Sequence, residues 1–580
     1  MPMLSLNNKR WLLSESSVKT VESLVGELGE SRLFSKLLVN RNVISSENAR
    51  FILDSSLDKL PDPFQMTGMS KAAERIVRAI ENDERITIFA DYDVDGVTSA
   101  AFMIYFFRDI GYPISHYLPD RMKEGYGISD QALEKILSEG GGLIITADCG
   151  ITAIKETERA REMGMDIIVS DHHQVGPEGL PKAVAVLNPH QPDCLYPYRF
   201  LSGVGIVLKL ATAVRSVLYK KGWDKEKLPN LRKLLDLFAL GTIADVAPLT
   251  EENHVLTRHG LVELAQSAKP GLVALKSVAG VNGSVDARAV GFSLGPRLNA
   301  AGRLGKADTG LDLLVSKDLE EAMELAQQLD KVNRERQEVQ KWTLKEALHK
   351  VEQEVDLNSD RVIVLASENF HRGVVGIVAA KLVDKYYRPA LLLTLSEKGA
   401  SGSGRSIPKF NLFKAISECA GELTQFGGHA YAAGVALDKD RVDVFRKHMN
   451  EIGKRILSAD DLIPEIWADA ELRLETVNRK QYKSIQRLEP FGAGNPVPLF
   501  ISRRVEVRGI RYTGKGKNHA YFKARQGGVY HNVIAFNMGD VFKLHINEGA
   551  HVDILYEIQV RSWNGRDSLQ LNLRDVRLAN

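Results

Sequence analysis

The sequence contains little cysteine, almost no net charge and no long apolar run. Its 580 residues include only three cysteines, Cys149, Cys194 and Cys419, which are too few and too scattered for a disulfide framework or a zinc knuckle. So few cysteines fit a reducing compartment, and we expect a cytoplasmic protein. The apolar stretch from Ala100 to Phe107 is far shorter than the roughly 20 residues of a membrane span. The first residues also lack the apolar run of a signal peptide.

The charge balance excludes a protein that attracts polyanions over its whole surface. The 76 basic and 74 acidic side chains leave a formal charge of +2, so any basic surface must be local. Hydrophobic residues make up 44% and charged residues 26% of the sequence. This balance is typical of a folded globular protein rather than a disordered or coiled-coil chain, and the length predicts several domains.

Short apolar runs alternate with helical patterns, which predicts an α/β fold. The strand-like runs at Ile86–Ala90, Leu143–Thr146, Ile167–Ser170 and Val184–Leu187 are typical of a doubly wound parallel sheet. Residues 319–355 contain many strong helix formers and neither proline nor glycine. They predict one long helix that connects two domains, with a helix inside a domain as the simpler alternative.

The second half of the chain predicts two further folded modules. A smaller α/β unit follows the long helix, and a proline- and glycine-rich segment, EPFGAGNP at 489–496, indicates a hinge. Short alternating strands with glycine turns then predict a small β-barrel that resembles an OB-fold. The expected segments are a helical leader (1–69), a catalytic domain (70–318), a connector helix (319–355), a second α/β domain (356–457), a linker (458–498) and a barrel (499–580).

Three carboxylates on alternate residues form the most distinctive local motif. Asp91, Asp93 and Asp95 directly follow the predicted strand at 86–90. Carboxylates this close repel one another and need a cation to hold them together. A calcium loop of the EF-hand kind is excluded, because Phe102 stands where that loop needs a glutamate and a strand precedes the motif. For the motif alone, a solvated acidic turn remains the alternative.

Other predicted strands also end in acidic or imidazole side chains. Asp148 follows the second strand, His172 and His173 follow the third, and Asp245 lies in an otherwise apolar stretch. Ligands bind at the carboxyl ends of strands in such sheets, so we expect these groups to meet at one edge. Carboxylate and imidazole without thiolate suit Mn²⁺, Mg²⁺ or Zn²⁺. There are enough groups for two ions that share a carboxylate, which predicts metal-assisted phosphoester hydrolysis.

The order of these motifs resembles the DHH phosphoesterase superfamily, named for the triplet that stands here as Asp171-His172-His173. The segments DYDVDG, TADCG, SDHH and GTIADVAP occur in the superfamily's order. Residues 356–457 resemble its companion DHHA1 domain through HRGVVG, GSGRSI and FGGHA. With the hinge and the barrel included, nearly the whole chain resembles the single-strand-specific 5′→3′ DNA exonucleases of that superfamily.

The resemblance implies two divalent cations, Mn²⁺ or Mg²⁺, as cofactors. Asp93 and Asp95 would each bind a different ion, and Asp148 would bridge the two. The implied metal ligands are Asp91, Asp93, Asp95, Asp148, His172 and Asp245. The implied catalytic residues are Asp93, Asp95, Asp148, His172, His173 and Asp245.

The same resemblance implies finer roles around these ions. His172 and Asp245 would complete the shell of the second ion, and His173 would face the scissile phosphate. Asp91 would lie at or just behind the first ion. The pyrophosphatase branch of the superfamily has a histidine where this chain has Phe89. The first ion would therefore be held more weakly.

The resemblance also implies which residues bind the substrate strand. The residues implied for substrate binding are Arg121, Arg372, Ser403, Arg405, Ser406 and His429. In the segment GSGRS the glycines allow close backbone approach, while the hydroxyl and the guanidinium can donate to phosphate oxygens. Arg121, Ser403 and Arg405 would form a pocket for the 5′ phosphate. For Arg121 alone a surface salt bridge is the alternative, and packing alone would explain the glycines around His429.

The terminal barrel adds a local basic surface. Residues 499–580 carry 13 Lys and Arg against seven Asp and Glu, with aromatic residues such as Tyr512 and Tyr530 interleaved. This combination suits a single strand bound through its backbone and by base stacking. We expect a metal-dependent 5′→3′ exonuclease that releases 5′-mononucleotides in DNA repair and recombination. Its expected partners are single-stranded DNA, a single-strand-binding protein and a helicase, and we expect a monomer that contacts no membrane.

Two other functions stay open from the sequence. A DHH phosphodiesterase for pyrophosphate, cyclic dinucleotides or very short oligonucleotides would share the chemistry, but it would not need the barrel or the connector. A non-catalytic relative that only binds single strands would have a decayed site. Every motif carboxylate and both histidines are present here, which argues against that second alternative.

Overall fold

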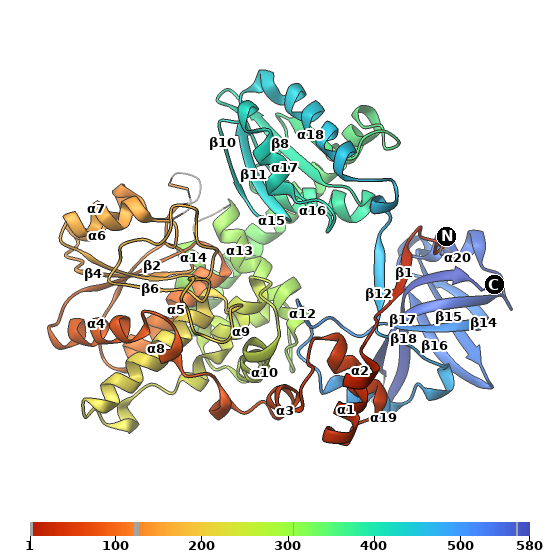
Figure 1. The fold of residues 1–580 in the computed structure, drawn as a ribbon, viewed down its shortest axis with the longest axis horizontal. Coiled ribbons are helices and arrows are strands. Elements are labelled where there is room, and N and C mark those ends of the chain that lie inside the picture. The colour runs from red at the N-terminus through yellow and green to blue at the C-terminus, as the bar shows by residue number, and fades with distance from the viewer. Residues whose placement is uncertain (1–3, 121–123, 126, 305–306, 564–565, 580) are drawn as a thin grey trace. The chain divides into compact units, whose positions relative to one another are not determined.

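The computed structural model describes residues 4–120, 124–125, 127–304, 307–563 and 566–579 (Figure 1). The chain forms two compact units, one made of residues 17–333 and 485–497, the other of 1–16, 334–484 and 498–580. We call them the sheet unit and the barrel unit. Among the described residues, no helix has both the length and the apolar character of a membrane span.

A five-stranded parallel sheet organises the sheet unit. The strands lie in the order β3 (Ser115–Tyr117), β2 (Ile86–Ala90), β4 (Leu143–Ala147), β5 (Asp166–Ser170) and β6 (Ala185–Leu187). All four pairings are parallel. Every residue of β2 and β4 is buried, which explains why these strands are continuous apolar runs in the sequence.

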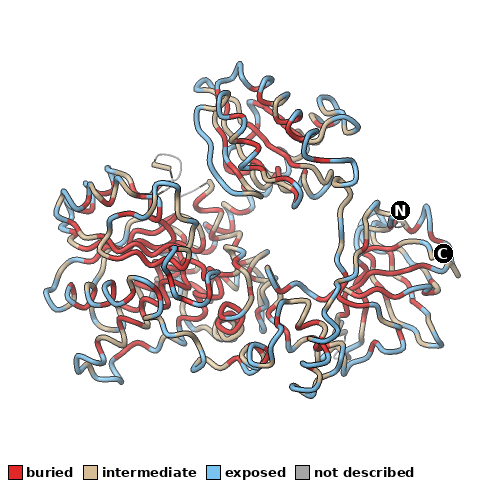
Figure 2. Tube along the Cα trace, in the orientation of Figure 1, coloured by how far each residue is buried: buried red, intermediate tan, exposed pale blue. Residues whose placement is uncertain are grey.

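Helices cover both faces of this sheet, and the predicted doubly wound fold is confirmed. One face packs against α4 (Met69–Glu81), α5 (Val94–Asp109) and α8 (Gly203–Lys220). The opposite face packs against α6 (Asp130–Ser138) and α7 (Ile154–Glu162). The sheet therefore lies at the centre of the buried core of this unit (Figure 2).

The strand order contains a topological switch point between β2 and β4. β2 has β3 on one side and β4 on the other, so the chain changes direction between β2 and β4. In doubly wound folds ligands bind outside the carboxyl ends of the strands at such a switch point. The acidic residues at 91–95 follow β2, and Asp148 follows β4, so both lie at the carboxyl ends of the strands on either side of this switch point.

The barrel unit begins with a smaller α/β domain. Its sheet has the order β10 (Gln425–Gly428), β11 (Ala432–Leu437), β9 (Gly399–Arg405), β8 (Ala390–Ser396) and β7 (Ile363–Ser367). Only β7 and β8 pair in parallel. One face packs on α16 (Val375–Tyr386), and the other packs on α17 (Leu412–Glu418) and α18 (Val442–Ile456).

The predicted terminal barrel is confirmed. Its strands are β14 (Phe500–Thr513), β15 (His519–Gln526), β16 (Val529–Ala535), β18 (Arg566–Leu578) and β17 (His551–Trp563). β17 pairs back onto β14, which closes the sheet into a barrel. A short strand, β13 (Ala470–Glu471), adds to β14, so this sheet starts before residue 499.

A single helix, α15 (Leu319–Glu354), runs through the predicted connector. Its 36 residues give a length of about 54 Å at 1.5 Å per residue. Ala322 and Ala326 belong to the core of the sheet unit, whereas Ala347 and Val351 belong to the core of the smaller α/β domain. The boundary between the two units, after residue 333, falls inside this helix.

The N-terminal leader, expected to be helical, contains three helices and one strand. Helices α1 (Val18–Leu28), α2 (Arg32–Asn40) and α3 (Ser46–Asp54) do form. They are preceded by a strand, β1 (Arg10–Leu13), which pairs in parallel with β12 (Glu465–Ala468). Four residues with a partner 455 positions away carry no local pattern from which the strand could be predicted.

The segment expected to be a hinge forms a compact, hydrogen-bonded turn. The side-chain amide of Asn495 donates to the carbonyl oxygens of Leu488 and Pro490, both at 2.8 Å. Its amide oxygen accepts from Nε of Arg41 at 2.8 Å. The proline and glycine residues therefore shape a turn that is fixed to the sheet unit.

Candidate metal centre

The acids that follow β2 and β4 converge as predicted. Asp91, Asp93 and Asp148 each offer a carboxylate oxygen, and these three atoms lie within 4.8 Å of one another. Asp93 caps the N-terminus of α5, where its Oδ1 accepts from the backbone nitrogens of Asp95 at 2.8 Å and Gly96 at 3.2 Å. Capping turns the chain sharply after β2, and this keeps the carboxylates at the edge of the sheet.

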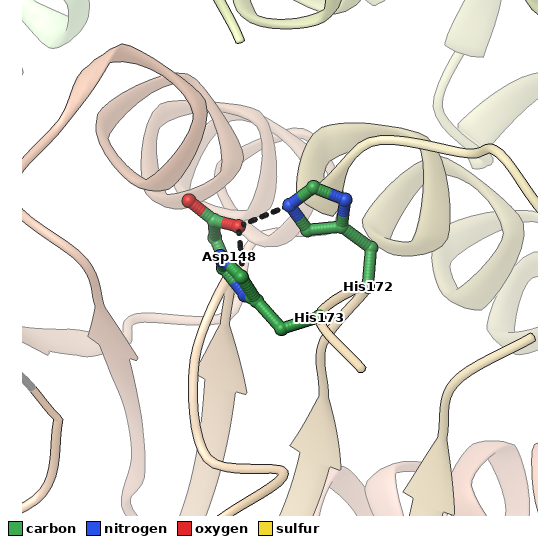
Figure 3. Close-up of side chains that lie close together, drawn as sticks. All are labelled: Asp148, His172 and His173. Atoms are coloured by element: carbon green, nitrogen blue, oxygen red, sulfur yellow. Dashed lines mark ion pairs between the residues drawn. The ribbon is translucent and has the colours of Figure 1, made fainter. Parts of the chain in front are cut away.

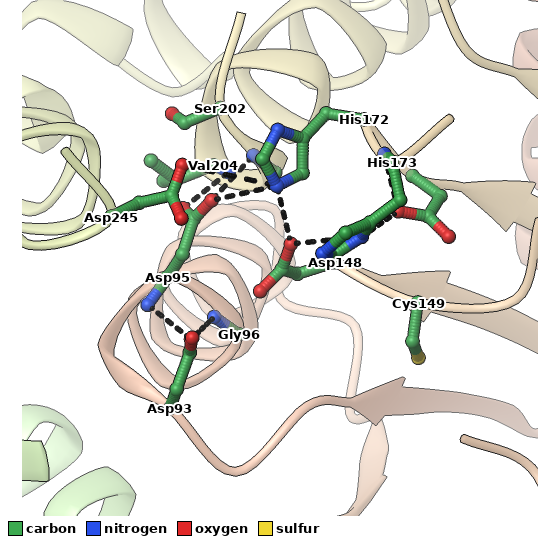
Figure 4. A network of polar contacts seen from close by, with 12 residues as sticks. Asp93, Asp95, Gly96, Asp148, Cys149, His172, His173, Ser202, Val204 and Asp245 are labelled. Atoms are coloured by element: carbon green, nitrogen blue, oxygen red, sulfur yellow. Dashed lines mark hydrogen bonds and ion pairs between the residues drawn. The ribbon is translucent and has the colours of Figure 1, made fainter. Parts of the chain in front are cut away.

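A second group of ligand atoms comes from Asp95, His172 and Asp245, again within 4.8 Å of one another (Figure 4). Nε2 of His172 lies 3.9 Å from Oδ2 of Asp95 and 3.8 Å from Oδ2 of Asp245. The same nitrogen lies 3.0 Å from Oδ1 of Asp148. Asp148 therefore stands between the two groups, and Asp93 and Asp95 belong to different groups.

The two histidines approach Asp148 together (Figure 3). Nδ1 of His173 lies 4.0 Å from Oδ1 of Asp148 and donates to Oδ1 of Asp171 at 2.7 Å. Asp171 is buried and also accepts from the backbone nitrogen of Ile151 at 2.9 Å. Asp171 thus fixes the ring of His173, a positioning role that we did not assign from the sequence although this residue opens the DHH triplet.

The carboxylates of this cluster are poorly compensated by positive charge. Burial, and then the charge of Asp93, raises the pKa of Asp95 to about 7. Burial, and then the charge of Asp95, raises the pKa of Asp245 to about 9. The pKa of the buried Asp148 is also raised, for the same reasons. A divalent cation would relieve this repulsion, so the donor set fits the expected ions.

The two histidines are held in different charge states. Burial, and then the charge of His173, lowers the pKa of His172 to about 4, so its ring is neutral at pH 7. A neutral imidazole can coordinate a metal. Burial lowers the pKa of His173, but the hydrogen bond and the charge of Asp171 outweigh burial and raise the pKa of His173 to about 9. His173 is therefore a cation that can donate to a phosphate oxygen.

The start of α8 completes the centre, and sequence reasoning missed it. The backbone nitrogens of Gly203 and Val204 donate to the two oxygens of Asp95 at 2.6 and 2.9 Å. A Cβ atom on Gly203 would lie 2.7 Å from Cβ of Asp148, so any other residue would displace Asp148 or the start of α8. The available signal was the run Ser202-Gly203-Val204-Gly205 at the start of an apolar helical pattern.

Phe89 takes no part in the centre. Its ring is fully buried on β2 and stacks on Tyr117 at a centroid distance of 5.5 Å. This face of the sheet packs against α6 and α7. The position that carries a histidine in the pyrophosphatase branch is thus a core position here.

Part of the expected phosphate pocket lies at the N-terminus of α16. Nη1 of Arg405 donates to Oγ of Ser403 at 3.0 Å. A Cβ on Gly376 would lie 3.1 Å from both Nη2 of Arg405 and Oγ of Ser403. Burial lowers the pKa of Arg405 from its usual 12.5. A buried guanidinium, a hydroxyl and the positive end of a helix dipole together favour an anion.

The other expected substrate residues have different surroundings. Arg372 is exposed in the turn before α16. Oγ of Ser406 donates to the carbonyl oxygen of Phe410 at 2.6 Å, so this hydroxyl supports the local turn. His429 is exposed in the loop between β10 and β11, where its backbone nitrogen donates to the carbonyl of Ala432. Arg121 lies outside the described residues.

Family models match the chain in three places. The DHH family N-terminal domain matches residues 85–242, the DHHA1 domain matches 359–455, and the RecJ OB domain matches 468–575. With the acidic and imidazole cluster at the switch point of the sheet, these domains define a phosphoesterase of the DHH class.

Whole-chain relatives identify the family within that class. The single-stranded-DNA-specific exonuclease RecJ of Bacillus subtilis (strain 168) is 40% identical over 571 residues, which cover 98% of this chain and 70% of that protein. The Escherichia coli K12 protein of the same name is 33% identical over 558 residues, which cover 94% of this chain and 95% of that protein. The crystal structure of RecJ from Thermus thermophilus in complex with Mn²⁺ matches with a TM-score of 0.83 and 28% identity. The match covers 98% of this chain and 80% of that chain. The chain belongs to the RecJ family of single-stranded-DNA-specific exonucleases.

Proposed function

We propose that this chain is a divalent-metal-dependent exonuclease that degrades single-stranded DNA from its 5′ end and releases 5′-mononucleotides. The observation that carries the proposal is the pair of ligand groups on either side of Asp148. Relatives are named single-stranded-DNA-specific exonucleases, and Thermus RecJ was solved with Mn²⁺ and with Mg²⁺. Carboxylate and imidazole donors suit those two ions.

In this proposal the six expected ligands divide between two ions. Asp91 and Asp93 would hold the first ion, His172 and Asp245 would hold the second together with Asp95, and Asp148 would contribute to both. When bound, such a pair of ions stabilises charge on the phosphoryl oxygens and lowers the pKa of water.

The chain's own groups then orient the substrate. Cationic His173 donates to an oxygen of the scissile phosphate while Asp171 holds its ring. Arg405 and Ser403 donate hydrogen bonds to a phosphate of the strand at the N-terminus of α16. Arg372, His429 and Arg121 are proposed to contact the strand, as the resemblance implies. Ser406 shapes the turn beside this pocket.

The barrel is proposed to hold the unpaired strand. Tyr530 and Phe536 are half exposed, whereas Phe522 is buried in the core. The guanidinium of Arg525 lies 5.8 Å from the centroid of the Tyr530 ring. An exposed ring beside a cation can stack a base and attract the backbone without reading sequence.

This assignment suggests a working context for the enzyme. We propose a monomer that acts in DNA repair and recombination in the cytoplasm, where a helicase and a single-strand-binding protein would supply its substrate. All three cysteines are buried free thiols, which fits a reducing compartment.

The test is digestion of end-labelled single- and double-stranded DNA with Mn²⁺, with Mg²⁺ and with chelator. The wild type should release mononucleotides from single strands only when metal is present. Asp148→Ala should abolish hydrolysis and leave strand binding largely intact, and Asp130→Ala, an exposed acid on α6, is the control. Hydrolysis restricted to very short oligonucleotides or cyclic dinucleotides would replace this proposal with the small-molecule alternative. Binding without hydrolysis would indicate a non-catalytic relative.

A further inference from the structure

A second cluster of metal-ligating side chains lies in the smaller α/β domain, away from the DHH motifs. Cys419, Glu422 and His448 each offer one ligand atom, and these atoms lie within 4.8 Å of one another. Cys419 follows α17 and precedes a short 3-10 turn, Ala420–Glu422. His448 lies on the neighbouring helix α18. None of the functional assignments above uses these three residues.

The local fold explains why the three side chains meet. Residues three apart in a 3-10 turn project on the same side, so Cys419 and Glu422 point together. The backbone nitrogen of Glu422 donates to the carbonyl of Cys419 at 3.0 Å, which closes the turn. On α18, Phe445 and Met449 are fully buried in the same core cluster as Cys419. The cluster therefore rests on packed elements rather than on a loose loop.

The polar atoms of the cluster are incompletely satisfied. Nδ1 of His448 lies 3.1 Å from Oε1 of Glu422. Oε2 of Glu422 is buried and has no hydrogen-bond partner among the described residues. His448 forms an ion pair with Glu422, whereas Arg455 of the same helix pairs with Glu418. A buried carboxylate oxygen without a partner points to a missing water or ion.

We propose that Cys419, Glu422 and His448 bind one Zn²⁺ ion, with water as the fourth ligand. Sulfur, imidazole and carboxylate are the donors that Zn²⁺ uses in proteins, whereas Mg²⁺ and Mn²⁺ prefer oxygen. Tetrahedral Zn²⁺ with bonds of 2.0–2.3 Å sets its ligand atoms roughly 3.3–3.6 Å apart, so small side-chain rotations close the site. The Cys419 thiol releases its proton to solvent as the ion binds, and His448 coordinates as a neutral ring.

The site is accessible to an ion from one side. The side chain of His448 is 36% exposed and that of Glu422 is 17% exposed, while Cys419 is fully buried. An ion would enter past His448 and reach the thiol last. Once bound, it would fasten the turn after α17 to α18.

The experiment uses the full-length protein, stripped of metal and titrated with Co²⁺, which also binds the carboxylate and imidazole centre of the sheet unit but meets no thiolate there. A Co²⁺–thiolate bond gives a near-ultraviolet charge-transfer band that a carboxylate or imidazole site does not give. We expect this band to saturate at one thiolate-bound Co²⁺ per chain and to disappear when Zn²⁺ is added. Cys419→Ser should abolish the band, and Cys194→Ser and Cys149→Ser, at the other two buried thiols, should retain it.

Two further variants keep the buried thiol in place and decide the outcome if Cys419→Ser misfolds. Glu422→Gln and His448→Gln should each weaken Co²⁺ and Zn²⁺ binding by roughly tenfold or more, with unchanged circular dichroism. A wild type without the band, a band that persists in Cys419→Ser, or unchanged affinity in both of these variants would overturn the proposal. The cluster would then be only a hydrogen-bonded His–Glu pair beside a buried thiol.

Discussion

Gly203 provides the sharpest test of how the fold positions the proposed metal centre. It is the first residue of α8, and its backbone nitrogen donates to Oδ2 of Asp95 at 2.6 Å. A Cβ at this position would lie 2.7 Å from Cβ and 2.9 Å from Oδ1 of Asp148. The substitution Gly203→Ala therefore adds one methyl group against the shared carboxylate and changes no proposed ligand.

The expected size of the effect follows from this distance. Non-bonded carbon atoms normally approach to about 3.5 Å, so Asp148 or the start of α8 must move by roughly 0.8 Å. A displacement near 1 Å in a catalytic site can reduce the rate about 100-fold. Crowding of this kind typically costs about 1–3 kcal/mol of folding free energy, which a protein of this size can tolerate. We expect a folded protein with about 100-fold slower hydrolysis.

The assay is single-turnover digestion of a 5′-labelled single strand at saturating Mn²⁺, with strand binding measured in chelator. The matched control is Gly205→Ala on the same helix, where the new Cβ would lie 3.2 Å from Cδ2 of Leu201 and 3.3 Å from Cε2 of Phe238, and would contact no proposed ligand. Gly205→Ala should digest DNA at close to the wild-type rate. If Gly203→Ala were as fast as Gly205→Ala, the position of Asp148 would not limit catalysis and the reasoning would be wrong.

Three other predictions test the phosphate pocket, a buried histidine and the barrel. Arg405→Ala should lower the preference for 5′-phosphorylated over 5′-hydroxyl ends by about 10- to 100-fold in kcat/KM, because it removes a charged hydrogen-bond donor. Burial lowers the pKa of His254 to about 4, so the unfolded chain binds more protons between pH 6.5 and 4 and stability falls as the pH drops through that range. His254→Gln should remove about 3 kcal/mol of this pH dependence in urea unfolding. Tyr530→Ala should weaken single-strand binding in chelator by about 1–3 kcal/mol through lost base stacking.

Each of these predictions has a control and a contradictory result. Arg441→Ala, at an exposed arginine of the same domain, should leave end preference unchanged. If Arg405→Ala preferred 5′-phosphorylated ends as strongly as the wild type does, the pocket assignment would be wrong. If His254→Gln showed the same acid sensitivity as the wild type, the buried ring would not be its source. Tyr219→Ala, at an exposed tyrosine in the sheet unit, should not affect strand binding. Equal binding by Tyr530→Ala would remove that ring from the proposed platform.

The convergence of the acids was predictable because it depends on local pattern plus one rule of topology. Asp91 and Asp148 each directly follow a strand with five buried residues, and parallel strands end at the same edge of a sheet. No comparable pattern links Gly203 to Asp95, which are 108 residues apart and meet through a backbone nitrogen. Gly376 similarly supports Arg405 only because α16 and β9 are neighbours in the fold. Contacts made by backbone atoms of distant residues cannot be predicted from the pattern of side chains in a sequence.

The turn at 489–496 shows what proline and glycine composition alone can indicate. Proline and glycine report which backbone angles a segment can adopt, whereas mobility depends on whether its polar groups find partners. Here the backbone nitrogen of Leu249 donates to the carbonyl of Ala493 at 2.7 Å, and Nε2 of His254 donates to that of Leu488 at 3.0 Å. The turn therefore holds Leu249 and His254, which follow Asp245 in the chain. These two partners lie at least 234 residues earlier in the sequence, so composition within 489–496 cannot show them.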